Sequence, residues 1–335
     1  MTRARRELVS LDATPYYHCI CRCVRRAFLC GEDHVTGRNY EHRKEWVLDR
    51  LHELQAVFTV DVCAYAIMSN HYHLVIRLNR EAAAELTEAQ VIERWGSLFA
   101  IPLLVQRYGQ DLCESDAEIR EAKKVIAQWR ERLSDLSWYM RCLNEPIARR
   151  ANEEDRCKGR FWEGRFKSQA LLDEAAVLTC MSYVDLNPVR AGLADTPEGS
   201  DFTSIQQRIR DSGATKTTRT EANPIRLMKL ARKIDDGHTN GFSFSTKDYL
   251  ALVDWSGRAV RAGKRGAIPE HVPPILERLG IGPAEYLRHV GGDGSIHEGA
   301  LFGHVDNIRQ VASRLGRAFV KGVGPSRRLF LRPVI

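Results

Sequence analysis

Apolar positions in the first part of the chain follow two spacings, one typical of strands and one typical of helices. Residues 16–24, 57–68 and 71–77 are rich in β-branched, aromatic and cysteine residues, which predicts three strands. The polar pair Ser69-Asn70 separates the last two, so we expect them to form a hairpin. Residues 40–53 carry apolar side chains at helical spacing, which predicts a helix between the first strand and the hairpin.

The rest of the chain is predicted to be mainly helical. A short strand is expected at 165–171, and Asp173 is a suitable N-cap for a helix that ends before Asn187-Pro188. Helical spacing recurs in five further segments, which are 81–132 (interrupted by Pro102), 136–152, 274–279, 283–289 and 304–319. This order of elements predicts an α+β fold in which a smaller, α-rich region follows the sheet.

The distribution of charge indicates the same two regions as the predicted helices and strands. The polar, aperiodic segment 211–223 predicts a linker between a first domain, 1–210, and a mostly helical C-terminal domain, 224–335. The net charge is +7, and residues 258–335 alone contain 13 Lys and Arg against 6 Asp and Glu. A basic excess gathered in one region favours a nucleic-acid partner, while a solvated surface remains the alternative.

Composition excludes several classes of protein. With 335 residues, 44% of them apolar, the chain can bury a core without disulfides. No apolar run approaches the ~20 residues that cross a bilayer, and a polar stretch follows the basic residues 1–6 where a signal peptide needs an apolar core. We therefore expect a soluble, cytoplasmic protein with no membrane partner, and a monomer in preference to a homodimer.

The nine cysteines fit that compartment because their number is odd and they are scattered. Cys19, Cys21 and Cys23 alternate along a predicted strand, so they share one face. A metal cluster is one interpretation, but no C-x-x-C pair accompanies them. Three small apolar side chains facing a core are the favoured interpretation.

Two pairs of residues have the spacing of a metal-dependent active site. His71 and His73 lie two apart on a predicted strand, which puts both imidazoles on one face, where they suit a divalent metal or a structural role equally. Tyr183 and Asn187 lie one helical turn apart. A phenol is a possible nucleophile and an amide oxygen a hard metal ligand, but these two residues alone favour the structural interpretation, a half-buried tyrosine and a helix C-cap.

A third segment, residues 159–167, alternates basic and aromatic side chains between glycines. Basic groups suit phosphates and aromatic rings stack on unpaired bases, whereas the structural alternative is a buried aromatic at the entry to a strand. The candidate DNA-binding residues here are Arg160, Phe161, Trp162, Arg165 and Lys167. Those of the basic C-terminal region are Arg258, Arg261, Lys264 and Arg265.

Three motifs occur in an order that resembles the single-tyrosine HUH transposases, in particular the REP-associated tyrosine transposases. They are Met68-Ser-Asn-His-Tyr-His-Leu-Val75, Gly164-Arg-Phe-Lys-Ser168 and Tyr183-Val-Asp-Leu-Asn-Pro-Val-Arg-Ala-Gly-Leu193. The resemblance runs from about Tyr16 to Leu193 and is interrupted by an insertion at about 81–132. It implies a ferredoxin-like HUH sheet with flanking helices, to which this chain adds a helical insertion and a small basic α-rich domain.

The resemblance also implies roles for residues. His71 and His73 match the metal-binding pair, with Tyr72 where the family usually has an apolar residue. Asn187 matches the third metal ligand, which is Gln in many transposases. Tyr183 matches the catalytic tyrosine, which forms a 5′-phosphotyrosine with DNA while Mg²⁺ or Mn²⁺ polarises the scissile phosphate.

The function implied is a metal-dependent single-stranded DNA endonuclease and strand transferase acting on REP-like hairpin DNA. Two alternatives remain. One is a hairpin-DNA-binding protein on the same fold whose catalytic site has decayed. The other is a structural metal protein that uses the two histidines and cysteines, although zinc-site spacing of cysteines is missing from the sequence. The basic C-terminal region is expected to contact the duplex stem of the hairpin.

Overall fold

A five-stranded sheet forms the centre of the molecule in the computed structural model, which describes residues 12–24, 30–32, 37–213, 224–230, 242–261, 271–293, 299–317 and 319–331. Its strand order is β2-β3-β1-β4-β5, with antiparallel pairing from β2 to β4 and parallel pairing between β4 and β5. The strands are β1 (Tyr16–Arg22), β2 (Val60–Ile67), β3 (His71–Leu78), β4 (Lys167–Leu171) and β5 (Leu301–Phe302). The predicted strands and the β2–β3 hairpin are confirmed.

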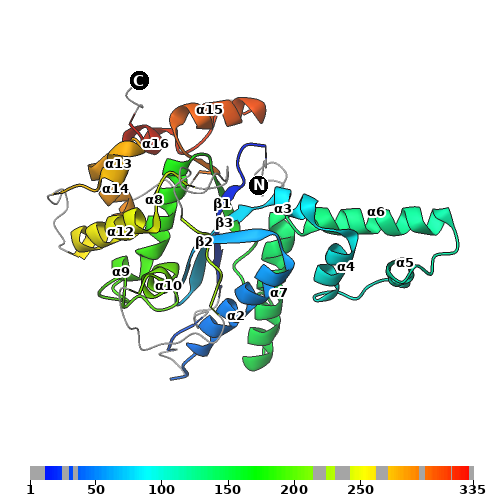
Figure 1. Cartoon of the computed structure of the whole chain (residues 1–335). Coiled ribbons are helices and arrows are strands. Elements are labelled where there is room, and N and C mark those ends of the chain that lie inside the picture. The colour runs from blue at the N-terminus through cyan, green and yellow to red at the C-terminus, as the bar shows by residue number, and fades with distance from the viewer. Residues whose placement is uncertain are drawn as a thin grey trace.

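Two helices cover one face of this sheet, α2 (His42–Val57) and α7 (Leu136–Glu154), and they contact each other (Figure 1). Cys19 and Cys21 of β1 belong to the hydrophobic cluster on this face and are almost fully buried. Their packing supports the interpretation as small core side chains. Among the described residues, no group of three or more His, Cys, Asp or Glu side chains is arranged to hold a metal.

The opposite face is covered by α8 (Glu174–Asp185), α10 (Ser204–Asp211) and α12 (Thr246–Arg261). Asp173 caps α8 as predicted, because its side chain accepts a hydrogen bond from the amide of Ala176. The helix ends at Asp185, and a short helix, α9 (Asn187–Arg190), continues in a new direction. This places the first part of the Tyr183–Leu193 motif, in α8, against the sheet, while its end at Leu193 is exposed.

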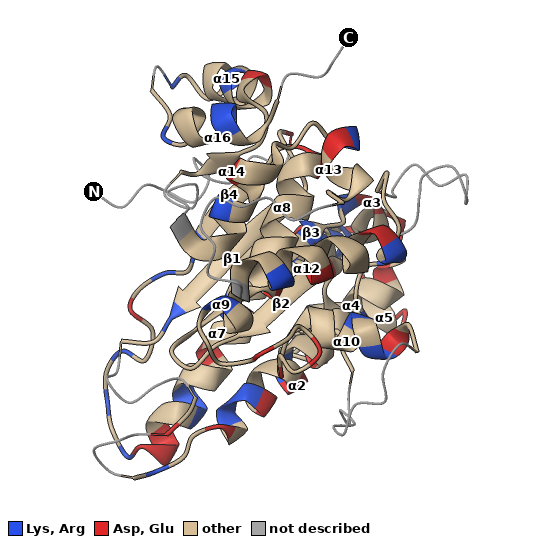
Figure 2. Ribbon diagram, turned by 90° about the vertical axis from the view of Figure 1, so that its left-hand side faces the viewer, with Lys and Arg blue, Asp and Glu red and all other residues tan. Residues whose placement is uncertain are grey.

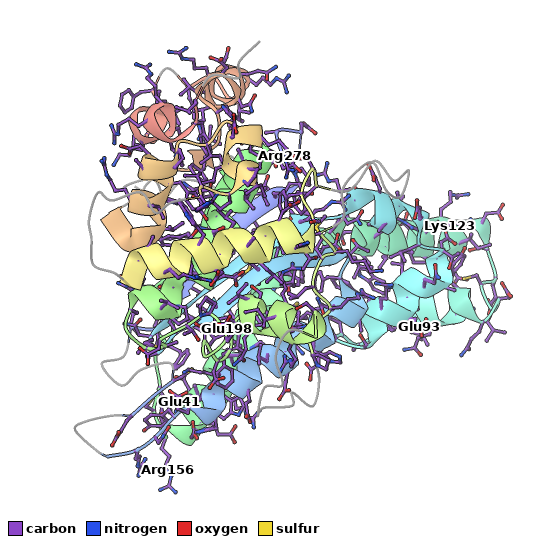
Figure 3. The ribbon with its side chains drawn as sticks, turned by 60° about the vertical axis from the view of Figure 1, so that its left-hand side comes forward. Glu41, Glu93, Lys123, Arg156, Glu198 and Arg278 are labelled. Carbon is purple, nitrogen blue, oxygen red and sulfur yellow. The ribbon has the colours of Figure 1, made fainter. Side chains whose placement is uncertain are left out.

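The segment predicted as a helical insertion forms an arm that projects away from the sheet (Figure 1). Pro102 separates two helices of the arm and is the N-cap of α5 (Leu103–Gly109). Trp95 and Trp129 stack with centroids 5.3 Å apart and hold the arm together at its base. Figure 3 shows Glu93 and Lys123 on this arm. Its helices are α3 (Arg80–Glu85), α4 (Glu88–Gly96), α5 (Leu103–Gly109) and α6 (Asp116–Arg132).

The C-terminal region is mostly helical, as predicted, but it also adds β5 to the sheet. Phe302 of β5 and Tyr286 are fully buried in one hydrophobic cluster with residues of β2 and α8. Residues 214–223, most of the predicted linker, lie outside the described part of the chain. The helices are α13 (Pro274–Arg278), α14 (Pro283–Arg288), α15 (Val305–Arg314) and α16 (Val323–Leu329), and a kinked turn, η1 (His289–Asp293), follows α14.

Helix α15 ends earlier than the periodicity predicts, because Gly316 follows it in the left-handed conformation with φ of 63°. The observed architecture is α+β. No helix in the described ranges combines the length and the apolarity that crossing a bilayer requires.

Candidate active site

Strand β3 places His71 and His73 on the face of the sheet that α8 covers, as the two-residue spacing predicts. Tyr72 between them points to the other face, where its hydroxyl donates to Asn144 Oδ1 at 2.7 Å. The ring nitrogens His71 Nε2 and His73 Nε2 are 3.0 Å apart. The two imidazoles therefore converge on one point at the start of β3.

Each of these imidazoles has a second partner at its other nitrogen. Asn70 Oδ1 lies 2.6 Å from His71 Nδ1, which must donate because an amide oxygen only accepts. His71 Nε2 therefore carries a lone pair. His18 Nε2 of β1 lies 2.9 Å from His73 Nδ1. Because His18 can either donate or accept there, it allows His73 to present either an N–H or a lone pair at Nε2.

The electrostatic surroundings keep His71 neutral. Burial and, to a smaller extent, the positive charges of Arg22 and Arg190 together lower its pKa to about 4. A neutral imidazole is the form that ligates metals. The two Nε2 atoms lie 3.0 Å apart, which is a hydrogen-bonding distance, and two imidazole nitrogens so close together could also share one divalent cation. The pair thus fits an open divalent-metal site.

Tyr183, in the last turn of α8, lies next to this pair. Its ring centroid is 5.8 Å from that of His73 and 6.4 Å from that of His18, and both contacts are edge-on. The guanidinium carbon of Arg190 lies 4.2 Å from the centroid of the Tyr183 ring. Tyr183 is half-buried, so the phenol sits at the edge of the site rather than in the core.

A hydrogen bond to Arg190 connects Asn187 to the site. Asn187 is buried, and its Oδ1 accepts a hydrogen bond from Arg190 Nη2 at 2.8 Å. Its Nδ2 is buried with no hydrogen-bond partner among the described residues. The oxygen expected to ligate a metal is therefore engaged by Arg190 in this conformation. The fold nevertheless brings His71, His73 and Tyr183 together and links Asn187 to Tyr183 through Arg190, and the roles of the four residues stay predictions.

The basic and aromatic segment 159–167 divides into two kinds of side chain. Arg160, Arg165 and Lys167 are exposed, and Lys167 lies opposite Ile20 in the β1–β4 ladder, on the same face as His18. Phe161 is only 2% exposed within the core. The prediction that Phe161 stacks on bases is therefore wrong, and the structural alternative holds at this position. Trp162 is half-buried and donates its Nε1–H to the Asn144 carbonyl at 3.0 Å.

The candidate DNA-binding residues of the C-terminal region are less well defined. Arg258 is exposed and forms an ion pair with Asp254 one turn earlier. Arg261 is the last residue of α12, and its side chain lies outside the described part of the structure. Lys264 and Arg265 also lie outside it. A role for these four residues in binding DNA stays a prediction.

Sequence reasoning missed three residues of the site: His18, Arg190 and His289. His18 was recognisable only as a strand histidine, because its contact with His73 depends on the β1–β3 register. Arg190 was part of the Tyr183–Leu193 motif but received no role. His289 stacks on Tyr183 from 106 positions away in the sequence, with centroids 5.4 Å apart, and no local pattern indicates such a contact.

Comparison with known proteins yields one weak similarity. No protein-family model and no curated protein matches the chain. Among solved structures, the chain is similar to a REP-associated tyrosine transposase bound to a REP hairpin, with 10% sequence identity and a TM-score of 0.37 over 68% of this chain and 100% of that one. A similarity of this size carries no argument about function, so the proposals below rest on the motifs and on the geometry of the site.

Proposed function

We propose that this protein is a metal-dependent single-stranded DNA endonuclease and strand transferase that acts on hairpin DNA of the REP type through a 5′-phosphotyrosine intermediate. The observation that carries the proposal is the convergence of His71 Nε2 and His73 Nε2 to 3.0 Å beside the ring of Tyr183. Both histidines have a partner at Nδ1. This is the arrangement by which proteins orient imidazoles toward a metal.

In the proposed reaction, the Tyr183 hydroxyl oxygen attacks a backbone phosphorus and the bond from phosphorus to the 3′-oxygen breaks. The phenolic proton is released, the leaving 3′-oxygen takes up a proton, and the phosphate stays bound to Tyr183. Attack by another 3′-hydroxyl reverses these steps and joins a new strand. A Mg²⁺ or Mn²⁺ ion held by His71, His73 and Asn187 would stabilise the charge that develops on the phosphate.

Positive charge around the site suits a phosphodiester substrate. Arg22 and Arg190 are close enough to His71 to lower its pKa. Lys167 is exposed on the same face of the sheet, and Arg165 is exposed just before it. These side chains are available to bind backbone phosphates of a single strand as it enters the site.

The arrangement of the sheet supports the finer assignment to a ferredoxin-like HUH fold. Strands β1 to β4 alternate in direction in the order β2-β3-β1-β4, and α2 and α7 share one face. In this proposal the sheet handles the single strand, and the basic region 224–335 binds the duplex stem. Figure 2 marks Lys and Arg positions in blue on the ribbons of α15 and α16.

One observation favours the alternative of a hairpin-binding protein without catalysis. Asn187 Oδ1 accepts a hydrogen bond from the positively charged Arg190, which leaves one lone pair of that oxygen for a metal and disfavours a cation beside it. Catalysis and binding separate in a gel assay with a labelled hairpin oligonucleotide that has a single-stranded foot. Cleavage in Mn²⁺ that disappears in EDTA and in His71→Ala or His73→Ala, with retained hairpin affinity, supports the nuclease. Metal-independent binding without any cleavage supports the alternative.

A further inference from the structure

We propose that η1, the turn of residues His289–Asp293 from the C-terminal region, forms one wall of the active site and that His289 is a positioning residue for Tyr183. This inference rests on the proposed function, because it assigns a role toward the proposed nucleophile. It goes beyond that function because the motifs that indicate the site end at Leu193, almost a hundred residues earlier in the chain.

The contact between His289 and Tyr183 is a buried ring stack. Their centroids are 5.4 Å apart with an interplanar angle of 27°. His289 is 2% exposed and also packs on Phe302 of β5, with centroids 5.7 Å apart. Since β5 is hydrogen-bonded to β4, the edge of the sheet supports His289, and His289 in turn supports the phenol ring.

Arg190 joins the same wall to the rest of the site. It donates to the Val290 carbonyl at 3.5 Å and to Asn187 Oδ1 at 2.8 Å, and its guanidinium lies over the Tyr183 ring. The backbone of η1 approaches this side chain so closely that a Cβ at Gly292 would lie 2.8 Å from Arg190 Cδ. Gly292 has φ of 102°, a conformation that also favours glycine.

These contacts matter because in-line attack on phosphorus requires the Tyr183 hydroxyl to be held in a fixed position. A tyrosine in the last turn of a helix has rotational freedom about its side-chain bonds unless neighbours restrict it. Here His289 and Arg190 pack on the ring while His73 and His18 contact its edges. Displacing a reacting group by about 1 Å typically slows catalysis about 10²-fold, so loss of the stack should slow the covalent step and spare DNA binding.

His289→Ala and His289→Phe separate stacking from proton transfer. We expect His289→Ala to form the covalent adduct about 10²-fold more slowly in a single turnover with unchanged hairpin affinity, and His289→Phe to recover most of the rate. If His289→Ala is as fast as the wild type, the positioning role is overturned. If His289→Phe is as slow as His289→Ala, the role is also overturned, because the imidazole would then contribute proton chemistry.

A second readout does not depend on DNA cleavage. Nuclear magnetic resonance of protein containing isotope-labelled tyrosine, with Tyr183→Phe to identify the signal, reports whether the Tyr183 ring is held. We expect slow ring rotation in the wild type and in His289→Phe, and fast rotation in His289→Ala. A wild-type ring that rotates as fast as that of His289→Ala would overturn the inference. If the wild type forms no adduct, the proposed function is wrong. The rates of ring rotation in the wild type and the His289 variants would still show whether His289 holds the Tyr183 ring.

Substitutions at the adjacent Gly291 and Gly292 form a matched pair that tests how closely η1 packs against Arg190. A Cβ at Gly292 meets Arg190, whereas a Cβ at Gly291 meets nothing within 4 Å. We expect Gly292→Ala to slow adduct formation and to loosen the Tyr183 ring, and Gly291→Ala to do neither, with hairpin affinity retained in both. Equal adduct rates and equal ring rotation in the two variants would overturn the proposed fit of η1 against Arg190.

Discussion

The helical arm and the C-terminal region both add helices to the central sheet, but they relate to it in opposite ways. Helices α3 to α6 pack mainly on one another and project outward, as Figure 1 shows. The C-terminal region instead adds strand β5, buries Phe302 in a cluster shared with α8, and brings His289 to Tyr183. The C-terminal region, which follows the motifs in sequence, therefore lies next to Tyr183. The arm, which is inserted between the motifs, projects away from the sheet (Figure 1).

The two regions also differ in charge. Residues 80–132 contain 8 Lys and Arg against 10 Asp and Glu, whereas residues 305–331 contain 6 against 1. Because phosphate binding depends on unbalanced positive charge, α15 and α16 are better suited to DNA than the arm. We therefore propose that the C-terminal region supports the site and contacts duplex DNA, and that the arm does neither.

The largest expected effect is on stability. Phe302→Ala removes a fully buried ring from the cluster that joins β5 to α8, which should lower the free energy of unfolding by about 3–5 kcal/mol. Leu103→Ala in the arm, where the side chain is exposed, should change it by less than about 0.5 kcal/mol. Urea unfolding of both variants measures the difference, and similar losses would remove the contrast between the regions.

The next largest effect is on the pH dependence of stability, and it comes from Asp185 at the end of α8, which is hydrogen-bonded to Tyr249 of the C-terminal region. Asp185 is fully buried and accepts hydrogen bonds from the Ile205 amide at 3.0 Å and from the hydroxyls of Ser204 and Tyr249. Burial raises its pKa from 3.8 to about 6 despite these donors. The folded protein therefore holds this proton more tightly than the unfolded chain does. The contribution of Asp185 to stability is present below pH 4 and is lost as the pH rises through 6, by about 3 kcal/mol.

Asp185→Asn removes that titration, so the free energy of unfolding of the variant relative to the wild type should rise between pH 4 and pH 6. Urea unfolding at several pH values measures this difference. A difference that stays constant over that range would show that Asp185 does not titrate there.

A third prediction concerns metal binding, to which neither region contributes a ligand. His18→Leu removes the partner of His73 Nδ1 and should weaken Mn²⁺ binding by about 10–100-fold. His18→Gln keeps a side chain that can donate or accept and should retain most of the affinity. His52→Leu on the exposed side of α2 is the control. Electron paramagnetic resonance of added Mn²⁺ measures binding without DNA, and equal affinity in His18→Leu would exclude His18 from the site.

The smallest expected effect separates the basic α15–α16 surface from the arm. The double variant Arg314→Glu with Arg327→Glu should weaken hairpin binding and flatten its salt dependence by a slope of up to about 2, since each phosphate contact contributes about 0.9. Lys123→Glu with Lys124→Glu makes the same change of charge on the arm and should alter neither quantity. Equal effects of the two double variants would mean that binding follows net charge rather than the α15–α16 surface.

Local patterns were sufficient for most elements and for the pairs of residues in the site. The two-residue period placed His71 and His73 together, and Asp173 marked the start of α8, because both features depend on neighbours in sequence. Burial of Phe161, the partnership of His18 with His73 and the stack of His289 on Tyr183 depend on contacts between distant segments. A single sequence carries no local pattern for those contacts.

The central claim is that Tyr183 is the nucleophile of a DNA-cleaving site. Incubation of the wild type with a hairpin oligonucleotide and Mn²⁺, followed by peptide mass mapping of the covalent adduct, tests it most directly. We expect a 5′-phosphotyrosine at Tyr183 that is missing in EDTA and in Tyr183→Phe, with hairpin affinity retained. An adduct at the buried Tyr72 or Tyr139, or cleavage by Tyr183→Phe at the wild-type rate, would contradict it.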